Sequence, residues 1–126
     1  MSQDVVSDAL SKIMNAKKSK KQEVLISKYS KVLMSLLEIV KKNGYITSYE
    51  INKNDKKLKI VFGKINECNA IKPRFEVRAR EIEKYIRRYL PARNFGMIII
   101  STSKGLMTHY EALEKEMGGS LIAYFY

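Results

Sequence analysis

The segment best equipped for chemistry is Ser101-Thr102-Ser103-Lys104-Gly105. Its hydroxyl groups can donate hydrogen bonds to phosphate oxygens, accept them from ribose 2′-OH groups and reach base edges. Lys104 adds positive charge, and Gly105 permits a positive φ and exposes backbone N–H groups. The pattern indicates a loop that contacts a sugar-phosphate chain, although Ser/Thr-rich loops are also common as plain connections between elements.

Catalysis is a weaker interpretation of this part of the chain. The phosphate loop of nucleotide-binding enzymes has a longer glycine-rich spacing before its Lys-Ser/Thr pair, and that spacing is missing. A serine nucleophile needs a base, and the only histidine, His109, lies in the pattern Thr108-His109-Tyr110-Glu111, which is typical of a capped helix start. One histidine and one cysteine also exclude a Cys/His zinc cluster. We therefore expect no enzyme, no metal, no cofactor and no small-molecule substrate.

The composition favours a polyanionic partner. The 126 residues include 24 Lys and Arg against 13 Asp and Glu, a formal net charge of +11. Such an excess predicts nucleic acid first and an anionic membrane second. No apolar run approaches the roughly 18 residues of a membrane span. The first residues lack the pattern of a signal peptide, and Cys68 has no second cysteine to pair with, so we expect a soluble cytoplasmic protein.

The first half of the chain predicts the element order α-β-α-β-β. Its helices follow from apolar stripes at helical spacing, and its hairpin follows from alternation of apolar and polar residues. The first helix could be capped by Ser2 or Asp4, and the second by Ser27 or Ser30, with Asn43-Gly44 as its stop. The expected elements are a helix through Val6 and Met14, an edge strand at 23–26, a helix at 28–42, and hairpin strands at 45–51 and 57–62.

The second half predicts mostly strands with one or two helices. The expected elements are strand pieces at 65–71 and 75–77, a helix through Ile82 and Leu90 that Pro91 ends, a strand at 95–101, a short helix ended by Gly118-Gly119, and a last strand at 120–126. The result is an α/β (α+β) fold of two small domains, residues 1–63 and 64–126. The apolar run before Ser101 predicts a strand covered on both faces, which would hold the hydroxyl groups rigidly.

The remaining basic and aromatic residues allow two interpretations each. The lysine runs at 17–21 and 53–59 suit solvated faces as well as phosphate contacts. All the arginines lie in the second half. Intrahelical pairs with Glu81 and Glu83 should satisfy some of the cations interleaved with them, which are Arg78, Arg80, Lys84, Arg87 and Arg88. Tyr85 and Tyr89 fall at core spacing, which favours core packing over base stacking.

Together these segments resemble one known family. The apolar run Phe95-Gly96-Met97-Ile98-Ile99-Ile100 leads into the hydroxyl-rich segment, and further matching residues lie on both sides of it. The chain is similar over nearly its whole length to the family of the eighth protein of the small ribosomal subunit, in its archaeal or eukaryotic-type branch. The other carrying segments are Asp8-Ala9-Leu10 to Asn15-Ala16, Ile71-Lys72-Pro73-Arg74-Phe75, Leu90-Pro91-Ala92-Arg93, Leu106-Met107-Thr108-His109, Glu111-Ala112 and Gly118-Gly119.

The resemblance implies two small α/β domains and a structural role in the small ribosomal subunit. It implies direct, early binding to an irregular helix in the central domain of small-subunit rRNA, with neighbouring ribosomal proteins as further partners and no membrane. By match of motif, the main RNA contact would be Ser101, Thr102, Ser103, Lys104 and Gly105, positioned by Thr108, with a secondary contact at Asn15, Ala16 and Lys17. The alternative function is a general basic RNA-binding protein without a cognate rRNA site.

Overall fold

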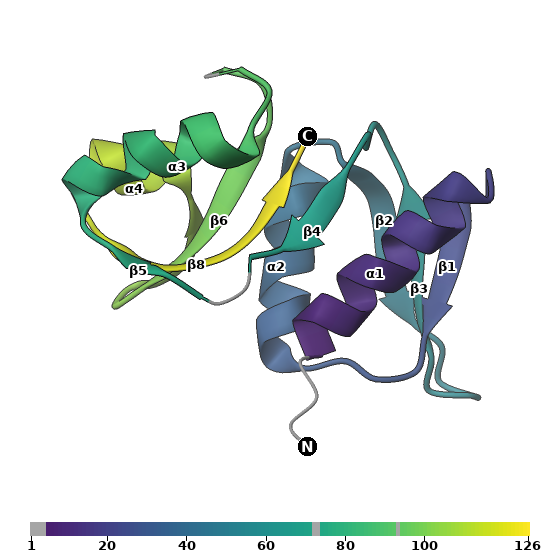
Figure 1. Cartoon of the computed structure of the whole chain (residues 1–126). Coiled ribbons are helices and arrows are strands. Elements are labelled where there is room, and N and C mark those ends of the chain that lie inside the picture. The colour runs from purple at the N-terminus through teal and green to yellow at the C-terminus, as the bar shows by residue number, and fades with distance from the viewer. Residues whose placement is uncertain (1–4, 72–73, 93) are drawn as a thin grey trace. The chain divides into compact units, whose positions relative to one another are not determined.

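The computed structural model describes residues 5–71, 74–92 and 94–126, and it divides the chain into two compact units, residues 1–69 and 70–126 (Figure 1). The expected junction after Gly63 lies earlier than this division. Residues 64–69 fall with the first unit, where Ile65 and Cys68 are buried and the Cys68 N–H group donates to the sulfur of Met14 at 3.3 Å.

The first unit has the predicted order α-β-α-β-β. Its elements are α1 (Val5–Lys18), β1 (Glu23–Ile26), α2 (Lys31–Lys42), β2 (Ile46–Ile51) and β3 (Leu58–Phe62). The strands form an antiparallel sheet in the order β1-β3-β2, with α1 against β1 and α2 against β2. Ser30 caps α2 by accepting a hydrogen bond from the Leu33 N–H group, as expected. The proposed caps of α1, Ser2 and Asp4, lie outside the described residues.

The second unit is mostly strands with short helices, which confirms the predicted fold class. After β4 (Cys68–Ala70), which spans the junction, come β5 (Glu76–Val77), η1 (Ala79–Glu81), α3 (Ile82–Tyr89), β6 (Met97–Thr102), β7 (Gly105–Thr108), α4 (His109–Glu114) and β8 (Gly119–Phe125). The sheet order is β4-β8-β6-β7, and β5 also pairs with β8. The strand β6 therefore lies inside the sheet, between β8 and β7.

The core of the second unit is built on β6. Residues Met97 to Ile100 are all fully buried, as expected for a strand covered on both faces. Ile98 and Ile100 share one apolar cluster with Ile82 and Ile86 of α3. Each such side chain stabilises the fold by about 1.5–3 kcal/mol relative to an exposed position. The strand is thus a rigid base for the hydroxyl-rich residues that follow it.

The structure differs from the prediction made from the sequence at two places in this unit. Residues 101–105 are not a loop between a strand and a helix but the end of β6, a turn and the start of β7, a strand that the sequence did not predict. Helix α4 ends at Glu114, so Gly118-Gly119 does not end it directly. A Cβ atom on Gly119 would overlap the carbonyl oxygen of Ser101, and glycine is therefore needed for β8 to approach β6.

Candidate nucleic-acid interface

The hydroxyl-rich segment forms a tight hairpin. Ser101 pairs with Leu106 and Thr102 with Gly105, which leaves Ser103 and Lys104 as the two turn residues. Gly105 has φ +107°, while nothing lies within 4 Å of the position where its Cβ atom would be. Glycine is thus required because of the backbone conformation of the turn, as in a turn closed by a glycine bulge, and not because a larger side chain would clash. Its predicted positive φ is confirmed.

The Thr102 hydroxyl group is used inside the hairpin. It donates to the carbonyl oxygen of Gly105 at 2.9 Å and accepts from the N–H group of Lys104 at 3.1 Å. Its proton and one lone pair are therefore occupied before any ligand arrives. Among the five residues of the segment, Thr102 holds the shape of the turn.

The other polar groups of the hairpin remain available. Ser103 and Lys104 are exposed, and Ser101 is half-buried. The side chains of these three residues have no hydrogen-bond or ion-pair partner in the described part of the chain. A serine hydroxyl can both donate and accept, and a lysine carries three donors and one charge. The tip of the hairpin therefore presents unpaired polar groups on a fixed backbone.

Thr108 and His109 support the hairpin from its far end. The Thr108 hydroxyl accepts from the N–H group of Glu111 at 3.3 Å and caps α4, as predicted. His109 is 1% exposed, and its Nδ1 atom accepts from the N–H group of Ile98 at 3.0 Å. Burial lowers the pKa of His109 from 6.5 to about 4, although the charge of Glu83 acts in the opposite direction. His109 is a neutral core residue that ties α4 to β6.

One polar residue beside the hairpin was not found from the sequence. Ser120 of β8 pairs with Ser101 of β6, and Glu76 of β5 pairs with Ser120. Paired residues point to the same face of a sheet, so the two serines and Glu76 form one row across three strands. The only signal in the sequence was a serine directly after Gly118-Gly119, and its partner strand could not be known from the sequence.

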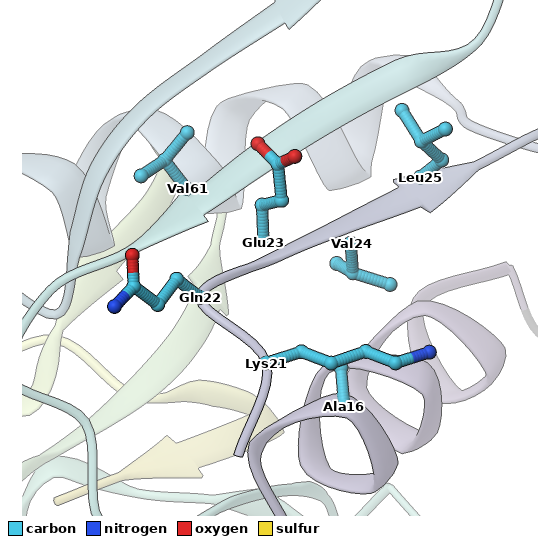
Figure 2. Close-up of a pocket in the computed structure, with 7 residues that line it drawn as sticks. All are labelled: Ala16, Lys21, Gln22, Glu23, Val24, Leu25 and Val61. Carbon is cyan, nitrogen blue, oxygen red and sulfur yellow. The ribbon is translucent and has the colours of Figure 1, made fainter. Parts of the chain in front are cut away.

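The residues of the predicted secondary contact lie at the end of α1 in the first unit. Asn15 and Lys17 are exposed, whereas Ala16 is only 7% exposed. Ala16 lines a groove of about 810 Å³ together with Lys21 and residues of β1 and β3. Figure 2 shows the Lys21 side chain extending past Ala16 and Val24. Ala16 could therefore contact a ligand only through this groove.

Cys68 belongs neither to the hairpin nor to the surface at the end of α1. It is buried, and its pKa is raised to about 12 by burial and then by the charge of Glu67. Its thiol is protonated at neutral pH and therefore a poor nucleophile or metal ligand. In the described ranges, no three His, Cys, Asp or Glu residues gather as metal ligands would, and no helix there is long and apolar enough to cross a membrane.

The cations of α3 differ from expectation. Lys84, Arg87 and Arg88 form no ion pair with the acidic residues that the structure describes, so the expected intrahelical pairs are absent at these three positions. Instead, the Lys84 ammonium group lies 5.7 Å from the ring centroid of Tyr85. Tyr85 and Tyr89 are half-buried and pack against the core, as the helical spacing indicated. Both tyrosine side chains therefore remain partly accessible to solvent.

Comparison with known proteins gives one consistent result. Residues 4–126 match the family described as "Ribosomal protein S8". The small ribosomal subunit protein uS8 of Nanoarchaeum equitans is 45% identical over 129 positions, covering 100% of both chains. The uS8 protein of Neurospora crassa is 43% identical, over 97% of this chain and 96% of its own, and uS8A of Schizosaccharomyces pombe is 39% identical, over 98% of each. The similarity covers both units.

Proposed function

Because the chain belongs to the ribosomal protein S8 family, we propose that it binds small-subunit rRNA directly, with the β6–β7 hairpin as the main contact. Membership bears out the resemblance drawn from the sequence. It makes the protein a structural constituent of the small ribosomal subunit, in a family of ribosomal proteins that are structural and not enzymes. The finer proposal is that it is a primary binder of the central domain of this rRNA in the cytoplasm and helps to assemble it.

The observation that carries the proposal is the hairpin itself. Ser103 and Lys104 are exposed at a turn whose shape Thr102 and Gly105 fix, and the strand behind them is fully buried. Little backbone entropy is lost when groups on such a pre-ordered turn bind. Regular A-form RNA hides its major groove, and specific readers therefore use irregular helices, 2′-OH groups and unpaired bases. A narrow hairpin with hydroxyl groups suits a ligand of that kind.

The groups divide into two roles. Ser101 and Ser103 would bond to ribose and base edges, Lys104 to a phosphate, and the backbone at Gly105 would allow close approach. Thr102 and Thr108 would act by positioning the turn and the end of β7. Asn15 and Lys17 would add a contact from the first unit, with Ala16 in the wall of the groove beside them.

The test is competition between two RNAs. The full chain is bound to a central-domain rRNA fragment at moderate salt, with and without excess tRNA. Ser103→Ala should weaken binding to the fragment by about 1–3 kcal/mol, since a directional contact is lost, and should leave tRNA binding almost unchanged. Ser35→Ala, which removes an exposed hydroxyl group from α2 of the first unit, is the matched control.

Two results would contradict the proposal. Equal losses on both RNAs for Ser103→Ala would remove the recognition role of the hairpin. Equal affinity of the unaltered chain for all RNAs, fading with salt, would instead support the alternative of a general basic RNA-binding protein.

A further inference from the structure

A continuous row of rings and one guanidinium group runs across the second unit, outside the hairpin. We call it the aromatic row. Its ring centroids and the Arg88 guanidinium carbon are 5.4–6.2 Å apart from one member to the next. In spatial order its members are Phe75, Arg88, Tyr89, Tyr124, Tyr126 and Phe95.

The row is partly open to solvent. Phe95 is 48% exposed, Arg88 is exposed, and the other four members are half-buried over the apolar core. Tyr124 and Tyr126 are two residues apart on or just after β8, so they point to the same side, and their rings are nearly parallel at 14°. Phe95 therefore leaves part of an aromatic ring accessible at one end of the row.

The charge beside the row is positive. Lys84, Arg87 and Arg88 line a shallow hollow of about 390 Å³, and no ion pair ties them to acidic residues within the described ranges. The Arg88 guanidinium carbon lies 5.6 Å from the Phe75 centroid and 5.7 Å from the Tyr89 centroid. Contacts with two rings restrict the side chain, so a planar cation is already oriented.

The Tyr124 end of the aromatic row lies toward the opposite end of β6 from the hairpin, whereas Phe75, whose carbonyl oxygen accepts from the N–H group of Leu121, lies toward the hairpin end. Tyr124 pairs with Ile98 near the start of the strand, whereas the turn follows Thr102 at its other end. At the usual rise of a strand these two positions are about 13 Å apart. Unpaired nucleotides on Tyr126 and Phe95 could therefore leave the hairpin uncovered.

We propose that the aromatic row is a second RNA contact that takes unpaired nucleotides. Bases stack on Phe95 and on the plane of Arg88, while Lys84 and Arg87 hold the phosphates. Proteins that bind single strands combine these elements, stacking platforms and a positively charged path for the backbone. The identity of the ligand as RNA rests on the function proposed above. A polyanion is favoured over a protein, because Lys84, Arg87 and Arg88 have no ion-pair partner within the described ranges and the chain has a formal net charge of +11.

The experiment uses the full chain and an unstructured oligouridine of about 12 nucleotides, a length within the range that single-strand binding surfaces cover. Phe95→Ala should weaken binding about tenfold, because one stacking surface is lost. Arg88→Lys keeps the charge but loses the planar group, and it should weaken binding severalfold. Lys115→Ala removes an exposed charge outside the row and should change affinity less than twofold. Thermal melting verifies that each variant is folded.

Three outcomes would overturn the proposal. Arg88→Lys and Phe95→Ala could both bind oligouridine like the unaltered chain. Photocrosslinks to oligouridine could map to the hairpin and not to Tyr89 or Phe95. Phe95→Ala could also leave RNA affinity intact and yet block incorporation into the subunit, which would make the row a protein contact.

The same variants separate this inference from the proposed function. If Ser103→Ala loses preference for the rRNA fragment while Phe95→Ala leaves oligouridine binding intact, the hairpin proposal stands and this one fails. If Phe95→Ala loses oligouridine binding while Ser103→Ala has no selective effect, the aromatic row stands as an RNA contact and the hairpin proposal fails.

Discussion

The β6–β7 hairpin and the corner between α1 and β1 both carry groups suited to RNA, but they hold them differently. In the hairpin, Thr102 makes two hydrogen bonds across the turn, and the strand behind it is fully buried. At the corner, the hydrogen bonds that hold the turn in the described part of the chain are backbone bonds, among them those from the Lys20 N–H group to the Lys17 carbonyl oxygen and from the Lys21 N–H group to the Ala16 carbonyl oxygen. The lysine side chains extending from it are exposed.

The difference predicts a difference in selectivity. Ordering a lysine side chain costs up to about 2 kcal/mol of entropy, whereas a serine has few rotamers to lose. Mobile lysines can follow many phosphate arrangements, so they should contribute attraction without much discrimination. The hairpin, on its fixed backbone, should discriminate more between RNA shapes. The first unit would then determine how strongly RNA is attracted, and the second which RNA is retained.

The largest expected effect comes from removing the support of the hairpin. Gly119→Ala should destabilise the protein by about 3 kcal/mol or more, because the new methyl group overlaps the Ser101 carbonyl and forces β8 away from β6. Urea denaturation measures the loss. Selective rRNA binding should fall as the protein is destabilised. Attraction of tRNA to the exposed lysines at the corner between α1 and β1, which we call the lysine corner, should persist.

Gly105→Ala is the matched control for this change. Its methyl group meets open space, and only the φ of +107° opposes it, so the cost should be about 1–2 kcal/mol. If Gly119→Ala were no more destabilising than Gly105→Ala, the close approach of β8 would not be what holds the hairpin.

A smaller effect depends on pH. Since burial lowers the pKa of His109 to about 4, the unfolded chain binds a proton more readily than the folded one between about pH 6.5 and 4. Stability should therefore fall as the pH is lowered through this window, by about 2 kcal/mol from this residue. Urea midpoints measured at several pH values test it.

His109→Gln is the comparison for the pH series, because an amide can still accept a bond but does not titrate in this range. The variant should lose part of the slope between pH 6.5 and 4, even if its overall stability is lower. An unchanged slope would show that carboxyl groups alone cause the acid sensitivity.

The smallest effect belongs to the corner. Lys17→Ala should weaken binding to the cognate fragment and to tRNA equally, by less than about 1 kcal/mol, and should lower the salt slope by about one. Binding measured at several salt concentrations gives both quantities. A loss confined to the cognate fragment would mean that the corner reads RNA structure, and the contrast with the hairpin would fail.

Local patterns were enough to predict most elements. The stripe through Leu33, Leu36 and Val40 with Ser30 before it and Asn43-Gly44 after it predicted α2, and the structure confirms the cap and the stop. The consecutive apolar residues of β6 predicted its burial. Each of these signals lies within a few residues of the feature it predicts.

Features that depend on distant partners could not be predicted in this way. β7 is short, and its turn residues Ser103-Lys104 are not a common turn pair, so only its pairing with β6 reveals it. The role of Gly119 depends on Ser101, and the burial of His109 on β6 and α4. For the candidate site, the residue types could be predicted, but not that the Thr102 hydroxyl is already occupied.

The position of β8 also bears on how the protein folds. Strand β6 pairs on one side with β7, which follows it directly, and on the other with β8, which begins only at Gly119. The hairpin closes a short loop, whereas pairing with β8 closes a longer one, so one edge of β6 can stay unpaired after the hairpin has formed. A chain at that stage exposes an apolar strand edge, which invites aggregation. Docking of β8 therefore protects that edge and gives the hairpin its final rigidity in one step.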